Sequence, residues 1–249
     1  MAVSKDKALE LRELARKLFF STATIDQTLE GATQAQIAFV CEMIALELEV
    51  RAQRKREKLF RKAAFPRLKS FEGYDFSQVS FPEDYDEEQL RSLEFLEEAQ
   101  DFVFYGQTGR GKTHLAIAIG AAAVARSKRV RFFTVAELVM ALTRAENAGN
   151  LDIMMADIAK SELLILDEFG YVPIDTTGAR LLFQVVSSCY EQRSLIVTTN
   201  IEFSKWGIVL GDDKLAAAMI DRIVHHGRLI EFGGESKRMG TSLMLGKTK

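Results

Sequence analysis

The feature that most constrains this chain is a glycine-rich stretch at residues 106–113, with the sequence Gly-Gln-Thr-Gly-Arg-Gly-Lys-Thr. It fits the pattern G-x-x-x-x-G-K-[ST] and stands between an apolar run at 102–105 and a helix-forming run at 114–119. A strand, a glycine loop and a helix in this order form a P-loop, whose backbone N–H groups surround phosphates. A glycine-rich turn of another kind would not need Lys-Thr after its last glycine. We therefore expect a nucleoside triphosphate site.

The whole loop and the start of the following helix are expected to contact ATP. Lys112 would reach the β- and γ-phosphates, and the hydroxyl of Thr113 would hold Mg²⁺. The expected cofactors are therefore ATP and Mg²⁺. The residues expected to bind the nucleotide are Gly106, Gln107, Thr108, Gly109, Arg110, Gly111, Lys112, Thr113, His114 and Asp167.

Candidate strands alternate with helical stretches over the second half of the chain. They lie at 102–106, 130–135, 163–168, 195–200 and 229–232. This alternation predicts an α/β fold, a P-loop NTPase with a five-stranded parallel sheet flanked by helices. The third strand ends in Asp167 and Glu168, at the edge where such sheets bind ligands. Asp167 would hold Mg²⁺ through water as a second metal-site residue beside Thr113, and Glu168 would polarise the attacking water. The alternative is a solvated strand end.

Two residues beyond these carboxylates are candidates for catalysis. Asn200 ends the fourth strand and is expected to orient the attacking water or contact the γ-phosphate. Its position resembles the sensor of AAA+ ATPases, whose fourth strand lies between the P-loop strand and the strand that carries the carboxylates. Arg222, on an expected helix at 215–226, would reach the γ-phosphate of a neighbouring subunit. A salt bridge is the alternative role for Arg222, and Arg238 is a second candidate for the same task.

Residues 5–64 have apolar positions at helical spacing, with a turn at Gly31. Towards the end of this segment, six basic residues fall on one helix face, offset only by Glu57. They are Arg51, Arg54, Lys55, Lys58, Arg61 and Lys62. Such a face is expected to follow the phosphates of duplex DNA without reading base sequence. An ordinary solvated helix face is the alternative.

Phe65-Pro66 is expected to end this helix, because proline disfavours a helical residue before it. The predicted domains are a helical DNA- or partner-binding domain at 1–65, a linker at 66–101 and an ATPase domain at 102–249. We expect no helical lid, because the segment at 233–249 that follows the last expected strand is too short for one. Within the linker, Phe76 or Phe81 would either pack beside the adenine ring or hold the linker on the core.

The composition excludes few functions. The net charge of -2 gives no sign of a nucleic-acid partner for the chain as a whole, so only local charge can indicate one. Cys41 and Cys189 lack metal-ligand neighbours, which favours buried thiols in a reducing cytoplasm. His225 and His226 are adjacent and have no further ligand in sight, so no metal site is expected there. We expect no signal peptide, because residues 1–17 alternate charged with apolar residues. The longest apolar stretch is shorter than the roughly 20 residues a bilayer requires, so we expect a cytoplasmic protein without membrane contact.

Several blocks of the sequence together resemble one known family. They lie at 61–66, 106–116, 166–170, 199–207, 215–226 and 234–238. The chain is similar over nearly its whole length to the IstB-type ATP-binding proteins, the transposition helpers encoded beside a transposase in bacterial insertion sequences. The resemblance implies a DNA-stimulated AAA+ ATPase that oligomerises on duplex DNA with ATP bound, deforms the DNA and recruits its cognate transposase.

Two other classes share part of this pattern. A replicative helicase loader of the DnaC/DnaI kind would have the same core and a different amino-terminal partner domain. A small-molecule P-loop kinase would need an acceptor pocket and would have no use for Glu168 as a base or for a basic helix. We therefore expect an ATPase that hydrolyses ATP to ADP and phosphate, with a helicase loader as the alternative.

Overall fold

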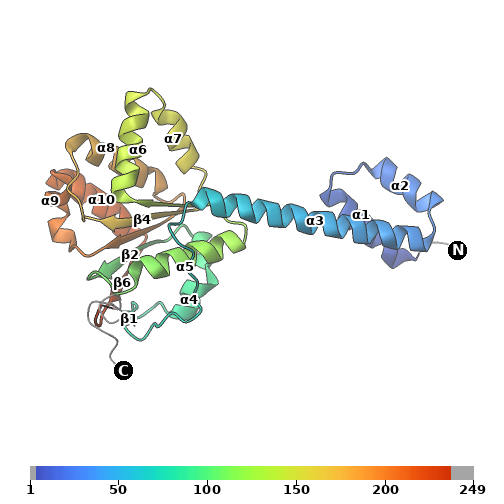
Figure 1. Ribbon diagram of the computed structural model, residues 1–249, viewed down its shortest axis with the longest axis horizontal. Coiled ribbons are helices and arrows are strands. Elements are labelled where there is room, and N and C mark those ends of the chain that lie inside the picture. The colour runs from blue at the N-terminus through green and yellow to red at the C-terminus, as the bar shows by residue number, and fades with distance from the viewer. Residues whose placement is uncertain (1–3, 237–249) are drawn as a thin grey trace. The chain divides into compact units, whose positions relative to one another are not determined.

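The computed structural model describes residues 4–236 and divides into two compact units, Met1–Lys58 and Leu59–Lys249. The first unit is helical (Figure 1). Its helices are α1 (Lys5–Lys17), α2 (Thr22–Gly31) and most of α3 (Gln34–Ala63). Their apolar stripes pack into a small core of Leu11, Ala15, Ile25, Ile37, Cys41 and Ile44.

The helical prediction for residues 5–64 missed one break in the chain. Helix α1 ends at Lys17, and Phe19 takes a left-handed conformation with φ 63°. Ser21 then accepts a hydrogen bond from the backbone N–H of Thr24 and caps α2. A serine side chain of this kind satisfies one of the N–H groups that a helix start leaves without a partner.

The second unit begins with linker elements and continues as alternating strands and helices. The linker elements are β1 (Val79–Ser80), α4 (Glu87–Ser92) and the 3-10 helix η1 (Glu94–Leu96). The strands of the core are β2 (Asp101–Gly106), β3 (Val130–Thr134), β4 (Leu163–Phe169), β5 (Ser194–Thr199) and β6 (Gly227–Phe232). Its helices are α5 (Lys112–Ala125), α6 (Val135–Asn147), α7 (Leu151–Ile158), α8 (Thr176–Cys189), η2 (Phe203–Lys205), α9 (Trp206–Leu210) and α10 (Asp213–His225).

The strands form one sheet in the order β1-β6-β2-β5-β4-β3. The five predicted strands are present and pair in parallel, and β5 lies between β2 and β4 as expected. The count of five was too low, because the linker adds β1, whose Val79 pairs antiparallel with Phe232 of β6. This short strand covers the edge of β6 and ties the linker to the sheet.

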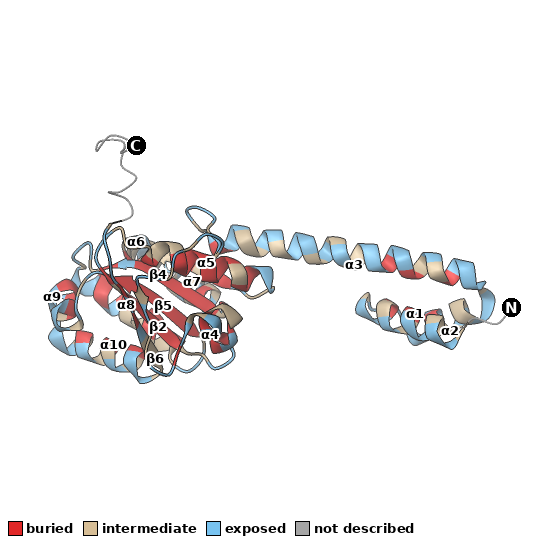
Figure 2. Ribbon diagram, turned by 90° about the horizontal axis from the view of Figure 1, so that it is seen from below, coloured by how far each residue is buried: buried red, intermediate tan, exposed pale blue. Residues whose placement is uncertain are grey.

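Helices cover both faces of the sheet, and the strands are buried between them (Figure 2). Side chains of α6, α8, α9 and α10 pack on one face, and those of α4, α5 and the end of α3 pack on the other. Along β2, Phe102 and Phe104 belong to the second layer, whereas Val103 belongs to the first. Strands buried on both faces are continuously apolar, as in parallel sheets generally.

Candidate nucleotide site

The glycine loop joins the end of β2 to the start of α5, as the sequence predicts. Gly106 approaches β6 so closely that a Cβ there would lie 2.4 Å from the carbonyl oxygen of Phe232. Gly111 has a φ of 94° and directly precedes α5, whose first turn has no side-chain cap. The N–H groups at this helix start therefore face the loop and are suited to an anion.

Lys112 is buried within the loop, with 5% of its surface exposed. Its Nζ donates hydrogen bonds to the carbonyl oxygens of Gly106 at 2.5 Å and Gln107 at 2.9 Å. The loop thus curls around the ammonium and holds it close to its own backbone. A cation fixed in this way can stabilise an entering phosphate with little reorganisation.

Asp167 lies at the end of β4 beneath the loop and is 3% exposed. Its Oδ1 accepts hydrogen bonds from the hydroxyls of Thr113 at 2.9 Å and Thr198 at 2.5 Å. Burial raises the pKa of the Asp167 carboxyl, and these two hydrogen bonds and the nearby charge of Lys112 oppose the rise. A carboxylate and a threonine hydroxyl within hydrogen-bond distance are oxygen donors of the type that Mg²⁺ prefers, so the residues fit that ion.

Glu168 has a different environment from its neighbour. Its φ is 62°, and the pairing of β4 with β5 is irregular between Leu166 and Phe169. The backbone N–H of Glu168 donates to the Thr198 hydroxyl at 3.1 Å, while the residue is exposed and lines the cavity over the loop. A single threonine hydroxyl therefore contacts both residues of the Asp-Glu pair.

The cavity over the loop has a volume of about 720 Å³ and is bounded by the loop, the linker and the ends of β4 and β5. From the linker, Tyr74 places its hydroxyl 3.4 Å from the carbonyl oxygen of Gly111 and its ring 5.0 Å from that of His114. Phe76 and Phe81 do not line this cavity; they stack on each other and pack against the core. Of the two roles considered for these rings, the structure favours attachment of the linker.

Most of the expected nucleotide-binding residues meet at this cavity. Those that line it are Thr108, Gly109, Arg110, Gly111, Lys112, Thr113 and His114, whereas Gly106, Gln107 and Asp167 do not. Glu168, the expected base, also lines the cavity. Asn200 follows the last residue of β5, is exposed and does not line the cavity. Arg222 lies on α10, where it donates to the carbonyl oxygen of Ala218 at 2.7 Å and stacks 4.8 Å from the Phe183 ring. Arg238 lies outside the described residues.

Sequence reasoning missed three residues of the site: Thr198, Tyr74 and Tyr171. Tyr171 lines the cavity, and its hydroxyl lies 3.0 Å from that of Thr108. The sequence signal for Thr198 was only its polarity in an otherwise apolar strand, which Thr199 and Asn200 share. The structure shows that Thr198 pairs with Phe104 of the P-loop strand. No sequence pattern indicated Tyr74 or Tyr171 as site residues, since both lie in loops whose paths depend on the fold.

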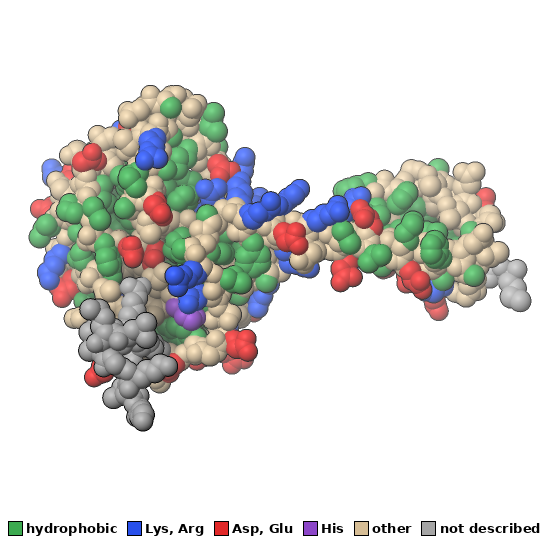
Figure 3. Space-filling view, in the orientation of Figure 1, with side chains coloured by type: hydrophobic (Ala, Val, Ile, Leu, Met, Phe, Trp, Pro, Cys, Tyr) green, Lys and Arg blue, Asp and Glu red, His purple; other side chains and the backbone are tan. Residues whose placement is uncertain are grey.

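The basic residues predicted on α3 are all exposed. Figure 3 shows Lys and Arg side chains gathered along the carboxyl-terminal half of α3. Arg51 pairs with Glu47 at 2.7 Å and Lys62 with Asp157 at 2.6 Å. Among the residues that the structure describes, no other member of the set has an acidic partner within 4 Å.

The fold and the loop define a P-loop nucleotide-binding protein of the AAA+ class. A family model described as IstB-like ATP binding protein matches residues 4–244, and the chain belongs to that family. A protein of Bacillus thuringiensis subsp. berliner named for ATP binding in insertion sequence IS232 is 35% identical over 93% of this chain and 91% of its own. A protein of Pseudomonas aeruginosa, named as an ATP-binding protein of insertion sequence IS21, is 34% identical over 86% of this chain and 82% of its own length.

Solved structures share the fold at lower identity. The crystal structure of DnaI has a TM-score of 0.51 at 19% identity and covers 68% of this chain and 90% of its own. The structure of AMPPCP-bound DnaA from Aquifex aeolicus has a TM-score of 0.51 at 22% identity and covers 61% of this chain and 46% of its own. Within residues 4–236, no helix has the length and hydrophobicity to cross a membrane.

Proposed function

We propose that this chain is an ATP-dependent DNA-binding ATPase that assists transposition of an insertion sequence. It would oligomerise on duplex target DNA, deform that DNA and recruit its cognate transposase. The observation that carries the proposal is that Lys112, Thr113 and Glu168 line one cavity, with Asp167 hydrogen-bonded to Thr113 beneath it, in a member of the IstB family. The names of the relatives, which refer to insertion sequences, support the biological role.

The loop residues would bind the triphosphate, with Lys112 against its β- and γ-phosphates. Thr113 and, through water, Asp167 would hold Mg²⁺, which neutralises phosphate charge during transfer. Glu168 would accept a proton from the attacking water, which its exposure on the cavity side supports. Asn200 would orient that water or contact the γ-phosphate. The residue directly follows β5, so a modest shift of the chain after Thr199 would bring its amide towards the nucleotide.

Arg222 would act on the γ-phosphate bound by a neighbouring copy of the chain, which makes hydrolysis depend on oligomerisation. Its present contacts support a role outside its own cavity, because the guanidinium rests on Phe183 of α8. A second copy would have to draw the guanidinium away from Ala218 and Phe183. That contact is a single hydrogen bond and one ring face, so the exchange is feasible.

The exposed basic residues of α3 would contact DNA phosphates. Arg54, Lys55, Lys58 and Arg61 support this best, because each is exposed and lacks an acidic partner among the described residues. Backbone contacts of this kind would bind duplexes of any sequence. The transposase, rather than this helix, would then supply any preference for a target sequence.

The test of ATP chemistry is Glu168→Gln, which should keep ATP binding and lose hydrolysis. Glu231→Gln, which alters an exposed carboxylate on β6, is the control and should keep both. Unchanged turnover in the Glu168 variant would rule out Glu168 as the base.

The same variant should hold the chain in its ATP-bound state and can therefore be used to measure DNA binding. Its affinity for duplex and for single-stranded DNA is compared with and without ATP. Stronger binding to single strands would favour a helicase loader over a transposition protein.

The test of the basic helix is a triple charge reversal at Arg54, Lys55 and Lys58. Each lost phosphate contact should flatten the slope of log affinity against log salt by about 0.9 on duplex DNA. The control reverses three exposed basic residues of α1, namely Lys5, Arg16 and Lys17. Equal slopes in the two variants would mean that net charge, and not this helix face, governs binding.

A further inference from the structure

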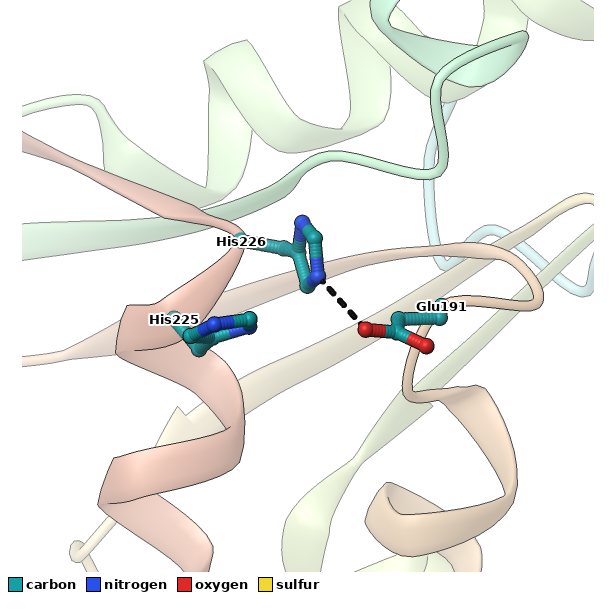
Figure 4. Close-up of side chains that lie close together, drawn as sticks. All are labelled: Glu191, His225 and His226. Carbon is teal, nitrogen blue, oxygen red and sulfur yellow. Dashed lines mark hydrogen bonds and ion pairs between the residues drawn. The ribbon is translucent and has the colours of Figure 1, made fainter.

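Two histidines and a glutamate meet on the surface of the second unit, outside the nucleotide cavity (Figure 4). His225 is the last residue of α10, His226 follows it, and Glu191 lies in the turn after α8. One ligand atom from each of the three lies within 4.8 Å of the others. No sequence pattern predicts a third ligand here, because Glu191 is distant in the chain and only the packing of α8 against α10 brings it near.

The three side chains converge in a way that leaves their ligand atoms facing one another (Figure 4). The His226 Nε2 lies 3.0 Å from the Oε1 of Glu191. With metal–nitrogen and metal–oxygen bonds of about 2.0–2.2 Å, two donors on one ion are separated by roughly 2.9–3.5 Å. The Glu191–His226 pair already has this spacing, and a ligand atom of His225 lies within 4.8 Å of both.

Tyr190 sets the orientation of the other histidine. Its hydroxyl lies 3.0 Å from the Nδ1 of His225, so Nε2 is the nitrogen available to a metal. In that state the Nδ1–H donates to the tyrosine oxygen, which fixes the tautomer and the plane of the ring. Glu191 has a φ of 55°, a conformation that non-glycine residues seldom adopt, and its carboxylate nevertheless points back to His226.

We propose that Glu191, His225 and His226 form a binding site for a divalent transition metal of the zinc class, with solvent completing the coordination. Two imidazoles and one carboxylate suit Zn²⁺, Co²⁺ or Ni²⁺ far better than Mg²⁺ or Ca²⁺, which prefer oxygen donors. The bound ion joins the turn after α8 to the carboxyl end of α10, one turn beyond Arg222. It therefore restrains the helix that carries this arginine.

The experiment uses the full chain without a histidine tag and Co²⁺ as a spectroscopic probe, with excess Mg²⁺ present to occupy oxygen sites. The chain has three histidines, so imidazole-bound Co²⁺ can report only His114 or this cluster. We expect one Co²⁺ per chain, displaced by Zn²⁺, with visible absorption bands that are lost in His226→Asn and kept in His114→Asn. Tyr190→Phe, which leaves all three ligands in place, should weaken binding by about tenfold.

A second readout keeps the test independent of how one variant folds. Zn²⁺ should raise the melting temperature of the parent chain and not that of Glu191→Gln, because a ligand of the folded state stabilises it by mass action. Circular dichroism checks that the variants are folded. The proposal is overturned if the parent binds no Co²⁺ through histidine, or if the bands persist in His226→Asn. The three side chains would then form only the two hydrogen bonds described above.

Discussion

Replacing Thr198 with valine is the sharpest single test of how the nucleotide site is built. The Thr198 hydroxyl is buried, donates to Asp167 at 2.5 Å and accepts the backbone N–H of Glu168 at 3.1 Å. Valine keeps the shape and the branched Cβ that suit a buried strand, and it removes both hydrogen bonds. Thr198→Val should therefore leave the fold and the affinity for ATP nearly unchanged and reduce turnover.

The magnitude follows from the two contacts. A hydrogen bond to a charged group contributes about 1.5–3 kcal/mol, and the hydrogen bond from Thr113 remains, so the lower part of that range applies to Asp167. Thr198→Val also leaves the backbone N–H of Glu168 without its acceptor. This loss adds about 1 kcal/mol to the free-energy cost, because the N–H is only partly accessible to water. Together the two losses amount to about 2.5–3 kcal/mol. If both carboxylates must hold their positions in the transition state, kcat should fall by about 70- to 160-fold.

The assay is steady-state ATP turnover at saturating nucleotide, Mg²⁺ and DNA, with nucleotide affinity measured separately by a fluorescent analogue. Thr198→Ser keeps the hydroxyl and should retain most of the activity. Ser194→Ala is a control in the same strand, because Ser194 is also buried but bonds the carbonyl oxygen of Phe95 at the opposite end of β5. Turnover of Thr198→Val within about threefold of the parent would refute the role given to this hydroxyl.

Three further predictions concern other parts of the second unit. Mixing Arg222→Ala chains with Lys112→Ala chains should restore ATPase activity that neither has alone, and no rescue at any ratio would contradict a trans arginine. Burial raises the pKa of Asp101 to about 8, well above its value of 3.8 in an unfolded chain. The folded state therefore holds a proton that the unfolded state has released, and stability should fall as pH rises from 4 to 8 by up to about 1.4 kcal/mol per pH unit. Urea titrations should show this slope in the parent and not in Asp101→Asn. Gly106→Ala should abolish nucleotide binding in a fluorescence titration, because its Cβ would meet the Phe232 carbonyl oxygen at 2.4 Å.

The parts of the fold that the sequence predicted are those set by local patterns. The glycine loop needs residues that tolerate close approach of the backbone, and its Lys-Thr end has few other uses. The apolar run before Asp167 marks a buried strand, and two carboxylates after such a run indicate the ligand-binding edge. Once the P-loop class is inferred, the place of β5 between β2 and β4 follows from the class and not from the residues of β5 themselves.

The remaining site residues could not be predicted, because their roles depend on how neighbouring strands are aligned. Thr198 and Asn200 are two residues apart, so a regular strand would place both on one face. The sequence offers no means of choosing between them. In the structure, β5 ends at Thr199, which leaves Thr198 beneath Asp167 and Asn200 exposed beyond the strand. The irregular pairing of β4 near Glu168 is likewise invisible in a run that is apolar on both faces.

The topology of β6 decides how Arg222 can act. β6 pairs in parallel with β2 from Gly227 beside Asp101 to Phe232 beside Gly106. The glycine loop begins at Gly106, which lies about 16 Å along β2 from Asp101 at a rise of roughly 3.3 Å per residue. Arg222 lies in the last turn of α10, just before β6 begins, and so sits near the opposite edge of the sheet from the loop. An arginine side chain cannot span that distance to its own nucleotide, so the proposed action of Arg222 requires a second copy of the chain.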